Sequence, residues 1–171
     1  MWKNTGKSRP ENAVEPGPGQ ESVWDYPRPP ALRRDNRLVE VKDGDVVIAS
    51  TAAAVRILET ASPPTFYIPL DDIDMARLIE TPGNSICEWK GMAQYWALAR
   101  EPGVPVAWSY PRPRSRFDRI QDHLAFYPGR IECYVDGERV RPQAGGFYGG
   151  WITAEVLGPY KGEPGSCLLY T

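Results

Sequence analysis

The distribution of proline and glycine constrains this chain more than any other feature of its sequence. The chain has 171 residues, of which 18 are Pro and 16 are Gly, and these lie between aromatic and aliphatic runs without forming one low-complexity block. Because Pro and Gly interrupt helices and favour turns, this punctuation indicates many short strands joined by turns. The length suits one domain with a hydrophobic core, so no disulfide or metal is required for stability.

Two Asp-Gly pairs predict two β-hairpins. Asp43-Gly44 and Asp136-Gly137 each separate two short runs that are rich in β-favouring residues. Asp-Gly readily adopts the positive φ angles of a two-residue hairpin turn. The flanking runs are residues 38–42, 45–50, 131–135 and 138–141.

Further strands and a few short helices are expected in the middle of the chain. Residues 86–90 and 92–99 meet at Gly91 and contain Trp and Tyr, which favour strands. Capping residues and apolar spacing predict the helices. The other expected strands cover residues 65–69 and 104–108, and the expected helices cover residues 51–60, 72–80 and 117–126. We therefore expect a mainly β domain with antiparallel hairpins and two or three short helices.

Charge and cysteine content argue against several classes of protein. The 20 Lys and Arg residues against 22 Asp and Glu residues give a net charge of -2, which disfavours a general nucleic-acid binder. Cys87, Cys133 and Cys167 lack the short spacings of metal or redox motifs, and the chain has no secretory signal, so we expect free thiols in the cytoplasm. No apolar run approaches the roughly 20 residues that cross a bilayer, and we expect no membrane association.

One aromatic and proline-rich pattern occurs twice. Residues 23–30 and 107–114 both contain Trp-x-Tyr-Pro-Arg-Pro, and each copy precedes one Asp-Gly hairpin. We interpret the copies as pseudo-equivalent halves, with coincidence in a Pro-rich chain as the alternative. Residues 1–21 lack apolar periodicity and are expected to be extended or disordered, whereas residues 22–171 are expected to form a single domain.

Several motifs, taken in order, resemble those of a known family. They lie at residues 56–60, 67–69, 87–96 and 108–111, and the third of them reads CEWKGMAQYW. Together they are similar to the domain of unknown function (DUF) family 427, with a family core at about 38–140. The resemblance implies a β-tent-like fold, in which two sheets meet at an angle. It implies no activity, and these residues give no support to the nucleotidyltransferase-like label sometimes attached to the family.

The residues do not favour cofactor chemistry. A structural zinc site needs four Cys or His ligands, usually in paired knuckles, and this chain has three dispersed Cys and one His. Neither a phosphate-binding P-loop nor a dinucleotide-binding glycine motif is present. Asp71, Asp72 and Asp74 fit the start of a helix better than a metal-binding pair. We therefore expect no metal and no other cofactor.

A group of aromatic and charged residues is the candidate ligand site. Aromatic rings supply flat apolar walls, and Arg and Lys donate hydrogen bonds to phosphate or carboxylate groups. Arg56 and Glu59, about one helical turn apart, could present their charges on one face, but a structural ion pair within an aromatic core is an equally weighted alternative. The candidate ligand-binding residues are Arg56, Glu59, Tyr67, Lys90, Tyr95, Trp108 and Tyr110.

Two functional hypotheses follow from these residues. In the first, the domain binds a small polar or anionic molecule, or a peptide. In the second it is an enzyme in which Lys90, Cys87 or Tyr95 reacts, with Glu59 as its partner. In a regular strand Cys87 and Lys90 would face opposite sides and would not cooperate, unless Gly91 marks a bulge. A homodimer is compatible with either hypothesis.

Overall fold

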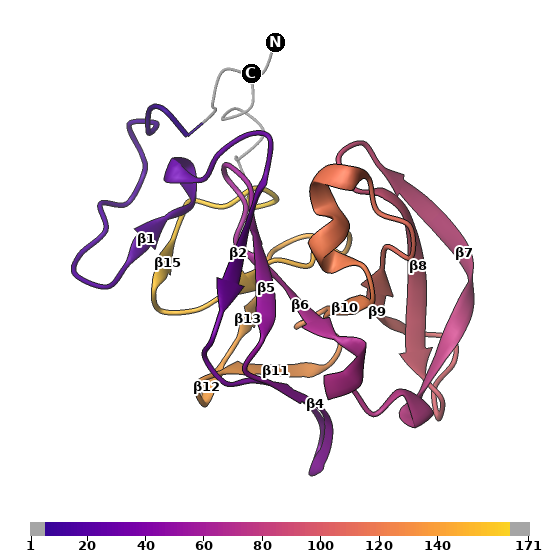
Figure 1. Ribbon diagram of the computed structural model, residues 1–171. Helices are drawn as coiled ribbons and strands as arrows, with labels where there is room; N and C mark the ends of the chain where they lie inside the picture. The colour runs from indigo at the N-terminus through magenta and orange to yellow at the C-terminus, as the bar shows by residue number, and fades with distance from the viewer. Residues whose placement is uncertain (1–5, 165–171) are drawn as a thin grey trace.

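The computed structural model describes residues 6–164 and shows a mainly β protein with several antiparallel sheets (Figure 1). The largest sheet has seven strands in the order β2-β5-β6-β10-β9-β8-β7, and all its neighbouring strands are antiparallel. Its strands are β2 (Ala31–Asp35), β5 (Ala54–Leu58), β6 (Thr65–Pro69), β7 (Leu78–Cys87), β8 (Gly91–Leu98), β9 (Pro105–Ser109) and β10 (His123–Phe126).

The second sheet consists of the two hairpins that the Asp-Gly pairs predict. Its order is β12-β11-β3-β4, and Gly44, Asp136 and Gly137 all have positive φ, as such turns require. Its strands are β3 (Val39–Asp43), β4 (Val46–Thr51), β11 (Glu132–Val135) and β12 (Glu138–Arg139). Two small sheets pair β1 (Glu21–Ser22) with β15 (Val156–Leu157) in parallel and β13 (Arg141–Pro142) with β14 (Trp151–Ile152) in antiparallel orientation.

The helical segments differ from the prediction. Residues 54–58 form β5, so the helix expected at residues 51–60 is wrong. The helices expected at residues 72–80 and 117–126 are limited to short 3-10 turns, because residues 78–80 begin β7 and residues 123–126 form β10. Short apolar runs of this kind fit a strand as well as a helix. The helical turns are η1 (Val23–Asp25), η2 (Leu70–Asp72), η3 (Met75–Arg77) and η4 (Ser115–Ile120), all of the 3-10 type. No helix in the described part of the chain is long and apolar enough to cross a membrane.

The two Trp-x-Tyr-Pro-Arg-Pro-like segments adopt different local structures. Trp24 lies in the 3-10 turn η1, whereas Trp108 lies in strand β9. Both indoles are buried, but they belong to different hydrophobic clusters. The two segments therefore differ in local conformation, and the interpretation of the copies as pseudo-equivalent halves stays a prediction.

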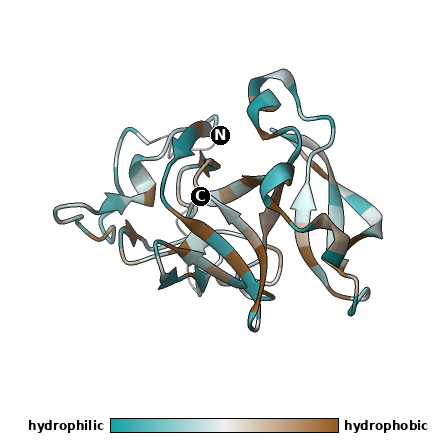
Figure 2. Ribbon diagram, turned by 60° about the horizontal axis from the view of Figure 1, so that its bottom comes forward, coloured by the Kyte–Doolittle hydropathy of each residue, from teal (hydrophilic) through white to brown (hydrophobic). Residues whose placement is uncertain are grey.

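The main hydrophobic core lies between the two larger sheets, and hydrophobic residues gather on the central strands (Figure 2). Phe66 and Ile68 of β6 enter this core together with Val39 of β3 and Cys133 of β11. Because alternate residues of a strand point to opposite faces, Tyr67 lies on the other face of the seven-stranded sheet. A second cluster of aromatic residues, which includes Tyr67, covers that face and positions the candidate site.

The described part of the N-terminal segment is held against the rest of the domain. The backbone N–H of Val14 donates to the carbonyl of Gly158 at 3.1 Å, and Arg9 forms a 2.7 Å ion pair with Asp25. These contacts hold Arg9 and Val14 against the domain, although most of residues 6–21 are exposed. Residues 1–5, which belong to the segment predicted to be extended or disordered, lie outside the described residues, as does Cys167.

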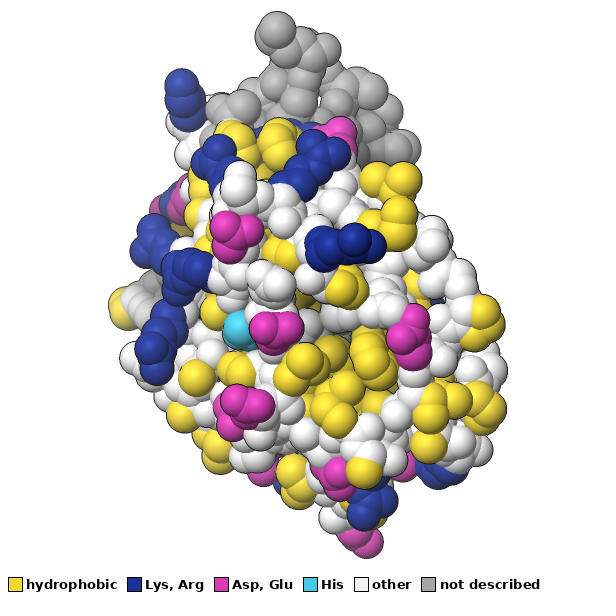
Figure 3. Space-filling model, turned by 45° about the vertical axis from the view of Figure 1, so that its right-hand side comes forward, with side chains coloured by type: hydrophobic (Ala, Val, Ile, Leu, Met, Phe, Trp, Pro, Cys, Tyr) yellow, Lys and Arg dark blue, Asp and Glu magenta, His cyan; other side chains and the backbone are white. Residues whose placement is uncertain are grey.

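Strand β7 forms an edge of the seven-stranded sheet. Hydrophobic side chains are exposed on the face of the molecule that Figure 3 shows. Ile86 of β7 is 75% exposed, and Met92, which lies opposite it on β8, is 52% exposed. An edge strand presents unpaired backbone groups that can pair with another chain. The homodimer expected from the sequence stays a prediction.

Candidate ligand-binding cavity

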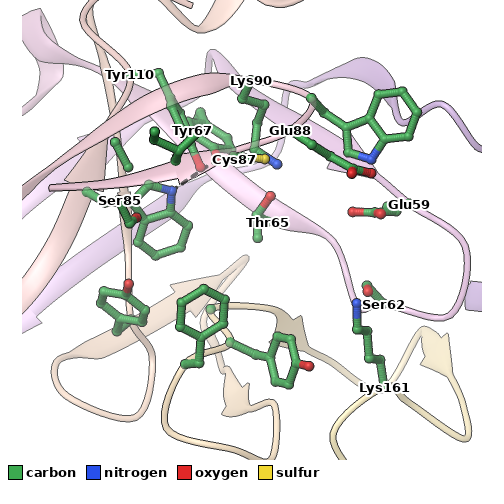
Figure 4. Close-up of a pocket in the computed structure, with 18 of the residues that line it drawn as sticks. Glu59, Ser62, Thr65, Tyr67, Ser85, Cys87, Glu88, Lys90, Tyr110 and Lys161 are labelled. Atoms are coloured by element: carbon green, nitrogen blue, oxygen red, sulfur yellow. Dashed lines mark hydrogen bonds between the residues drawn. The ribbon is translucent and has the colours of Figure 1, made fainter. Parts of the chain in front are cut away.

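A cavity of about 340 Å³ opens on the face of the seven-stranded sheet opposite the main core (Figure 4). Its volume lies within the range of small-molecule sites, roughly 300–1,000 Å³. The lining side chains come from the sheet, which forms the floor of the cavity, and from the β7–β8 turn, residues 59–65 and the C-terminal part of the chain. They include Arg28, Glu59, Ser62, Thr65, Tyr67, Ser85, Cys87, Glu88, Trp89, Lys90, Tyr95, Trp108, Tyr110, Tyr127, Phe147, Tyr148 and Lys161.

A row of paired residues across four strands forms the floor of the cavity. Ala125 of β10 lies in register between Tyr67 of β6 and Trp108 of β9, and Trp108 lies opposite Tyr95 of β8. Because Ala125 is small, it leaves space between its larger neighbours. The indole N–H of Trp108 donates to the hydroxyl of Tyr67 at 3.2 Å, and the Tyr127 ring packs 4.5 Å from the Trp108 ring. These contacts hold the rings in place.

The buried phenols of the cavity keep their protons at neutral pH. Burial raises the pKa of Tyr67 and Tyr110, and it raises the pKa of Tyr127 to about 12. A protonated phenol can donate a hydrogen bond to an oxygen of a ligand. The floor therefore offers O–H donors beside flat apolar surfaces.

The raised pKa of Tyr127 predicts that the protein loses stability at alkaline pH. The folded pKa of Tyr127, about 12, lies above the ordinary value of 10.0, so its contribution to stability is complete below pH 10 and is lost as the pH rises towards 12. We expect the urea midpoint of unfolding to fall between pH 9 and pH 11, and to fall less in Tyr127→Phe. Equal declines in the two proteins would contradict this account of Tyr127.

The β7–β8 turn brings Lys90 back over the cavity. Strand β7 ends at Cys87, and Gly91 adopts a φ of 111°, a left-handed conformation that suits glycine. The N–H of Arg114 donates to the Lys90 carbonyl at 3.0 Å and fixes the turn. The Lys90 ammonium lies 5.7 Å from the centre of the Tyr110 ring. The expectation of a regular strand over residues 86–90 is thus wrong at its end.

As a result, Lys90 and Cys87 meet, contrary to the prediction that they face opposite sides. The ammonium lies within hydrogen-bonding reach of the Cys87 sulfur, and Figure 4 shows the two atoms side by side. Burial alone would lower the pKa of Lys90, but its interactions with Tyr67, Cys87 and the Glu59 carboxylate raise it, and the net pKa lies above its ordinary value. Lys90 is therefore a cation at neutral pH.

Two carboxylates share one arginine at another part of the wall. The guanidinium of Arg28 binds Glu59 at 3.0 Å and Glu88 at 3.3 Å, and it lies 5.4 Å from the centre of the Trp89 ring. We name Arg28, Glu59 and Glu88 the acidic triad. Lys161, from the C-terminal part of the chain, lies 5.5 Å from the centre of the Tyr148 ring.

Arg56 does not belong to this cavity. In β5 it pairs with Phe66, while the neighbouring Val55 pairs with Tyr67, so period-two alternation places Arg56 on the other face of the sheet. Arg56 forms ion pairs there with Glu21 and Asp35. The predicted pairing of Arg56 with Glu59 fails because it assumed a helix.

The cavity also contains residues that the sequence alone did not identify. Arg28 lies in the first Tyr-Pro-Arg-Pro segment and Trp89 in the 87–96 motif, so both were within reach of motif analysis. Tyr127, Phe147 and Lys161 carry no periodic signal that could have assigned them to a site. In residues 6–164 no group of three or more His, Cys, Asp and Glu side chains could hold a metal ion.

Comparison with protein families identifies a match that covers part of the cavity lining. A family model described as "Domain of unknown function (DUF427)" matches residues 31–137, which is more than half of the chain. The chain belongs to the DUF427 family. The DUF427 match includes the cavity floor, Glu59, Cys87 and Lys90, whereas Arg28, residues 147–149 and Lys161 lie outside it. A comparison with curated proteins finds none that matches the chain.

Proposed function

We propose that this DUF427 domain binds a small polar molecule with an anionic group, and that the Lys90 ammonium is the charge partner of that group. The observation that carries the proposal is the position of the Lys90 side chain inside a cavity of about 340 Å³ with aromatic walls. Lys90 takes part in none of the ion pairs formed among residues 6–164. An anion that forms hydrogen bonds with this partly buried ammonium would restore interactions that the ammonium loses when it leaves water.

The surroundings of Lys90 support the same proposal. The hydroxyls of Tyr67, Tyr110 and Thr65 lie beside it in the cavity, and each can donate to an oxygen of the bound anion (Figure 4). The aromatic walls would cover the apolar part of the ligand. A cytoplasmic location is part of this proposal, and the thiols of Cys87 and Cys133, both free, are consistent with it.

A thermal-shift screen of nucleotides, sugar phosphates, amino acids and peptides tests the proposal. A ligand of the native state should raise the melting temperature of the wild type. In Lys90→Gln we expect at least about tenfold weaker binding, because a charge-assisted hydrogen bond contributes about 1.5–3 kcal/mol. Lys42→Gln is the matched control, since Lys42 lies on β3 beside Tyr134. Hits that stabilise Lys90→Gln as strongly as the wild type would contradict the proposal.

A second candidate function is an enzyme that uses Cys87 as a nucleophile. The observation in its favour is the contact of the Cys87 sulfur with the Lys90 ammonium, because a neighbouring cation stabilises a thiolate. The other expected reacting groups fit less well. Lys90 is protonated, and the hydroxyl of Tyr95 is bound to Ser85 at 2.6 Å. Glu59, expected as the partner, is held instead by Arg28.

Alkylation with iodoacetamide tests this second function. In a Cys167→Ser background, we expect Cys87 to react faster than Cys133, which is fully buried and whose pKa is raised by burial. We also expect Lys90→Gln to slow the alkylation of Cys87 several-fold, measured by mass spectrometry of the labelled peptides. If the Cys87 rate is the same in the wild type and in Lys90→Gln, the thiol is not activated and this function is excluded.

A further inference from the structure

Charges of opposite sign lie at different parts of the cavity wall. Figure 4 shows Lys90 beside Cys87, the carboxylates of Glu59 and Glu88 facing each other, and Lys161 beside Ser62. A ligand that fills the cavity meets both groups. A ligand with only an anionic group would bring that charge close to two carboxylates as well as to Lys90.

The acidic triad keeps a net negative charge. Arg28 supplies one positive charge, and its two terminal nitrogens each bind one oxygen of a different carboxylate, Glu59 at 3.0 Å and Glu88 at 3.3 Å. Two carboxylates with one guanidinium carry a charge of −1 in total. The side chain of Glu59 is 24% exposed, so this charge is less screened than on an open surface. The acidic triad therefore attracts a cationic group of a ligand, while Lys161, which lines the same cavity beside Ser62, contributes a positive charge of its own.

Much of the remaining wall is aromatic. Trp89 adjoins the acidic triad and Tyr110 adjoins Lys90, while Phe147 and Tyr148 come from the C-terminal part of the chain. Aromatic side chains favour the edge or face of another ring at distances of about 4.5–7 Å. The cavity thus offers a cationic contact, an anionic contact and a surface for a planar ring.

We propose that the ligand is an aromatic zwitterion, a small molecule in which a ring carries both an anionic and an ammonium group, as in an aromatic amino acid. Its anionic group binds Lys90, its ammonium binds Glu59 and Glu88, and its ring packs on the aromatic wall. The position of the anionic group rests on the proposed function. The ammonium contact does not, because it follows from the net charge of the acidic triad.

Three probes that share one ring separate these contributions. L-phenylalanine carries both charges, 3-phenylpropionate carries only the anion, and 2-phenylethylamine carries only the cation. Binding of each to the full chain is measured by titration calorimetry. We expect phenylalanine to bind at least about tenfold more tightly than either singly charged probe, since each added charge contact contributes roughly 1.4 kcal/mol or more.

Variants assign each contact to a residue. In Glu59→Gln we expect phenylalanine to lose its advantage over 3-phenylpropionate, while the affinity for 3-phenylpropionate stays equal or rises. Glu101→Gln is the matched control, because Glu101 lies on an exposed turn. In Lys90→Gln we expect weaker binding of phenylalanine and of 3-phenylpropionate, with that of 2-phenylethylamine retained.

The outcomes distinguish the two proposals. If 3-phenylpropionate binds as tightly as phenylalanine and Lys90→Gln weakens both, the zwitterion is excluded and the anion site stands. If phenylalanine binds best and Glu59→Gln weakens it but Lys90→Gln does not, the ammonium contact stands and the proposed role of Lys90 fails. If none of the three probes binds, the aromatic zwitterion is excluded, and the broader screen of anions decides the proposed function alone.

Discussion

Replacing Trp151 with alanine is expected to lower the free energy of unfolding by about 3–5 kcal/mol. Trp151 is fully buried in the main core, where its ring stacks on Phe66 with centroids 4.7 Å apart and planes 20° apart. Its indole N–H donates to the carbonyl of Phe126 at 3.0 Å. The alanine variant loses the ring contacts, leaves a void and removes the donor of a buried carbonyl.

Urea denaturation followed by circular dichroism measures this effect as a change in midpoint at constant slope. Trp89→Ala is the matched control, because the Trp89 ring is only partly buried and lies on the cavity wall. We expect a clearly smaller loss of stability in the control. Equal losses of stability in the two variants would contradict this account, because they would show that Trp151 contributes no more to stability than Trp89 does.

Replacing Gly149 with alanine is expected both to destabilise the fold by about 1–3 kcal/mol and to abolish ligand binding. A Cβ atom at this position would lie 2.2 Å from Cη2 of Trp108 and 2.6 Å from its Cζ3. The indole cannot simply rotate away, because Tyr67 accepts its N–H and Tyr127 packs on its ring. Either the indole or the 147–149 segment must shift, and both line the cavity.

Gly146→Ala is the matched control for this substitution. Gly146 lies three residues away on the same segment, and a Cβ there would meet nothing within 4 Å. We expect this control to keep the melting temperature of the wild type and its response to ligand. A Gly149→Ala protein that binds ligand with unchanged affinity would mean that the ligand does not approach Trp108.

Local signals in the sequence account for much of the fold. The Asp-Gly turns and the β-favouring runs act over a few residues, and they place β3, β4, β6, β11 and β12 close to their observed bounds. The strand order of the seven-stranded sheet depends on long-range pairing, which no local pattern encodes. The same limit explains the expected helix at residues 51–60, where pairing with β2 and β6 imposes a strand. The β-tent arrangement implied by the family resemblance stays a prediction.

The candidate site was predictable where residue type mattered and unpredictable where backbone geometry mattered. Amphipathic residues from the middle of the chain line one cavity. Arg56 was assigned wrongly because the direction of its side chain follows from strand register, which the sequence does not reveal. The contact between Cys87 and Lys90 depends on the turn at Gly91, where a positive φ overrides simple alternation. Most of the site residues expected from the sequence line the cavity, namely Glu59, Tyr67, Cys87, Lys90, Tyr95, Trp108 and Tyr110.

The most direct test of the central claim is a two-dimensional ¹⁵N–¹H titration that follows the indole N–H signals while the best compound from the thermal screen is added. Single Trp→Phe variants assign the signals. The account predicts that Trp108, whose N–H donates to Tyr67 on the cavity floor, and Trp89 shift on binding, while Trp24 and Trp151 do not. Saturating shifts at Trp24 or Trp151 with none at Trp108 would place the ligand elsewhere and contradict the account.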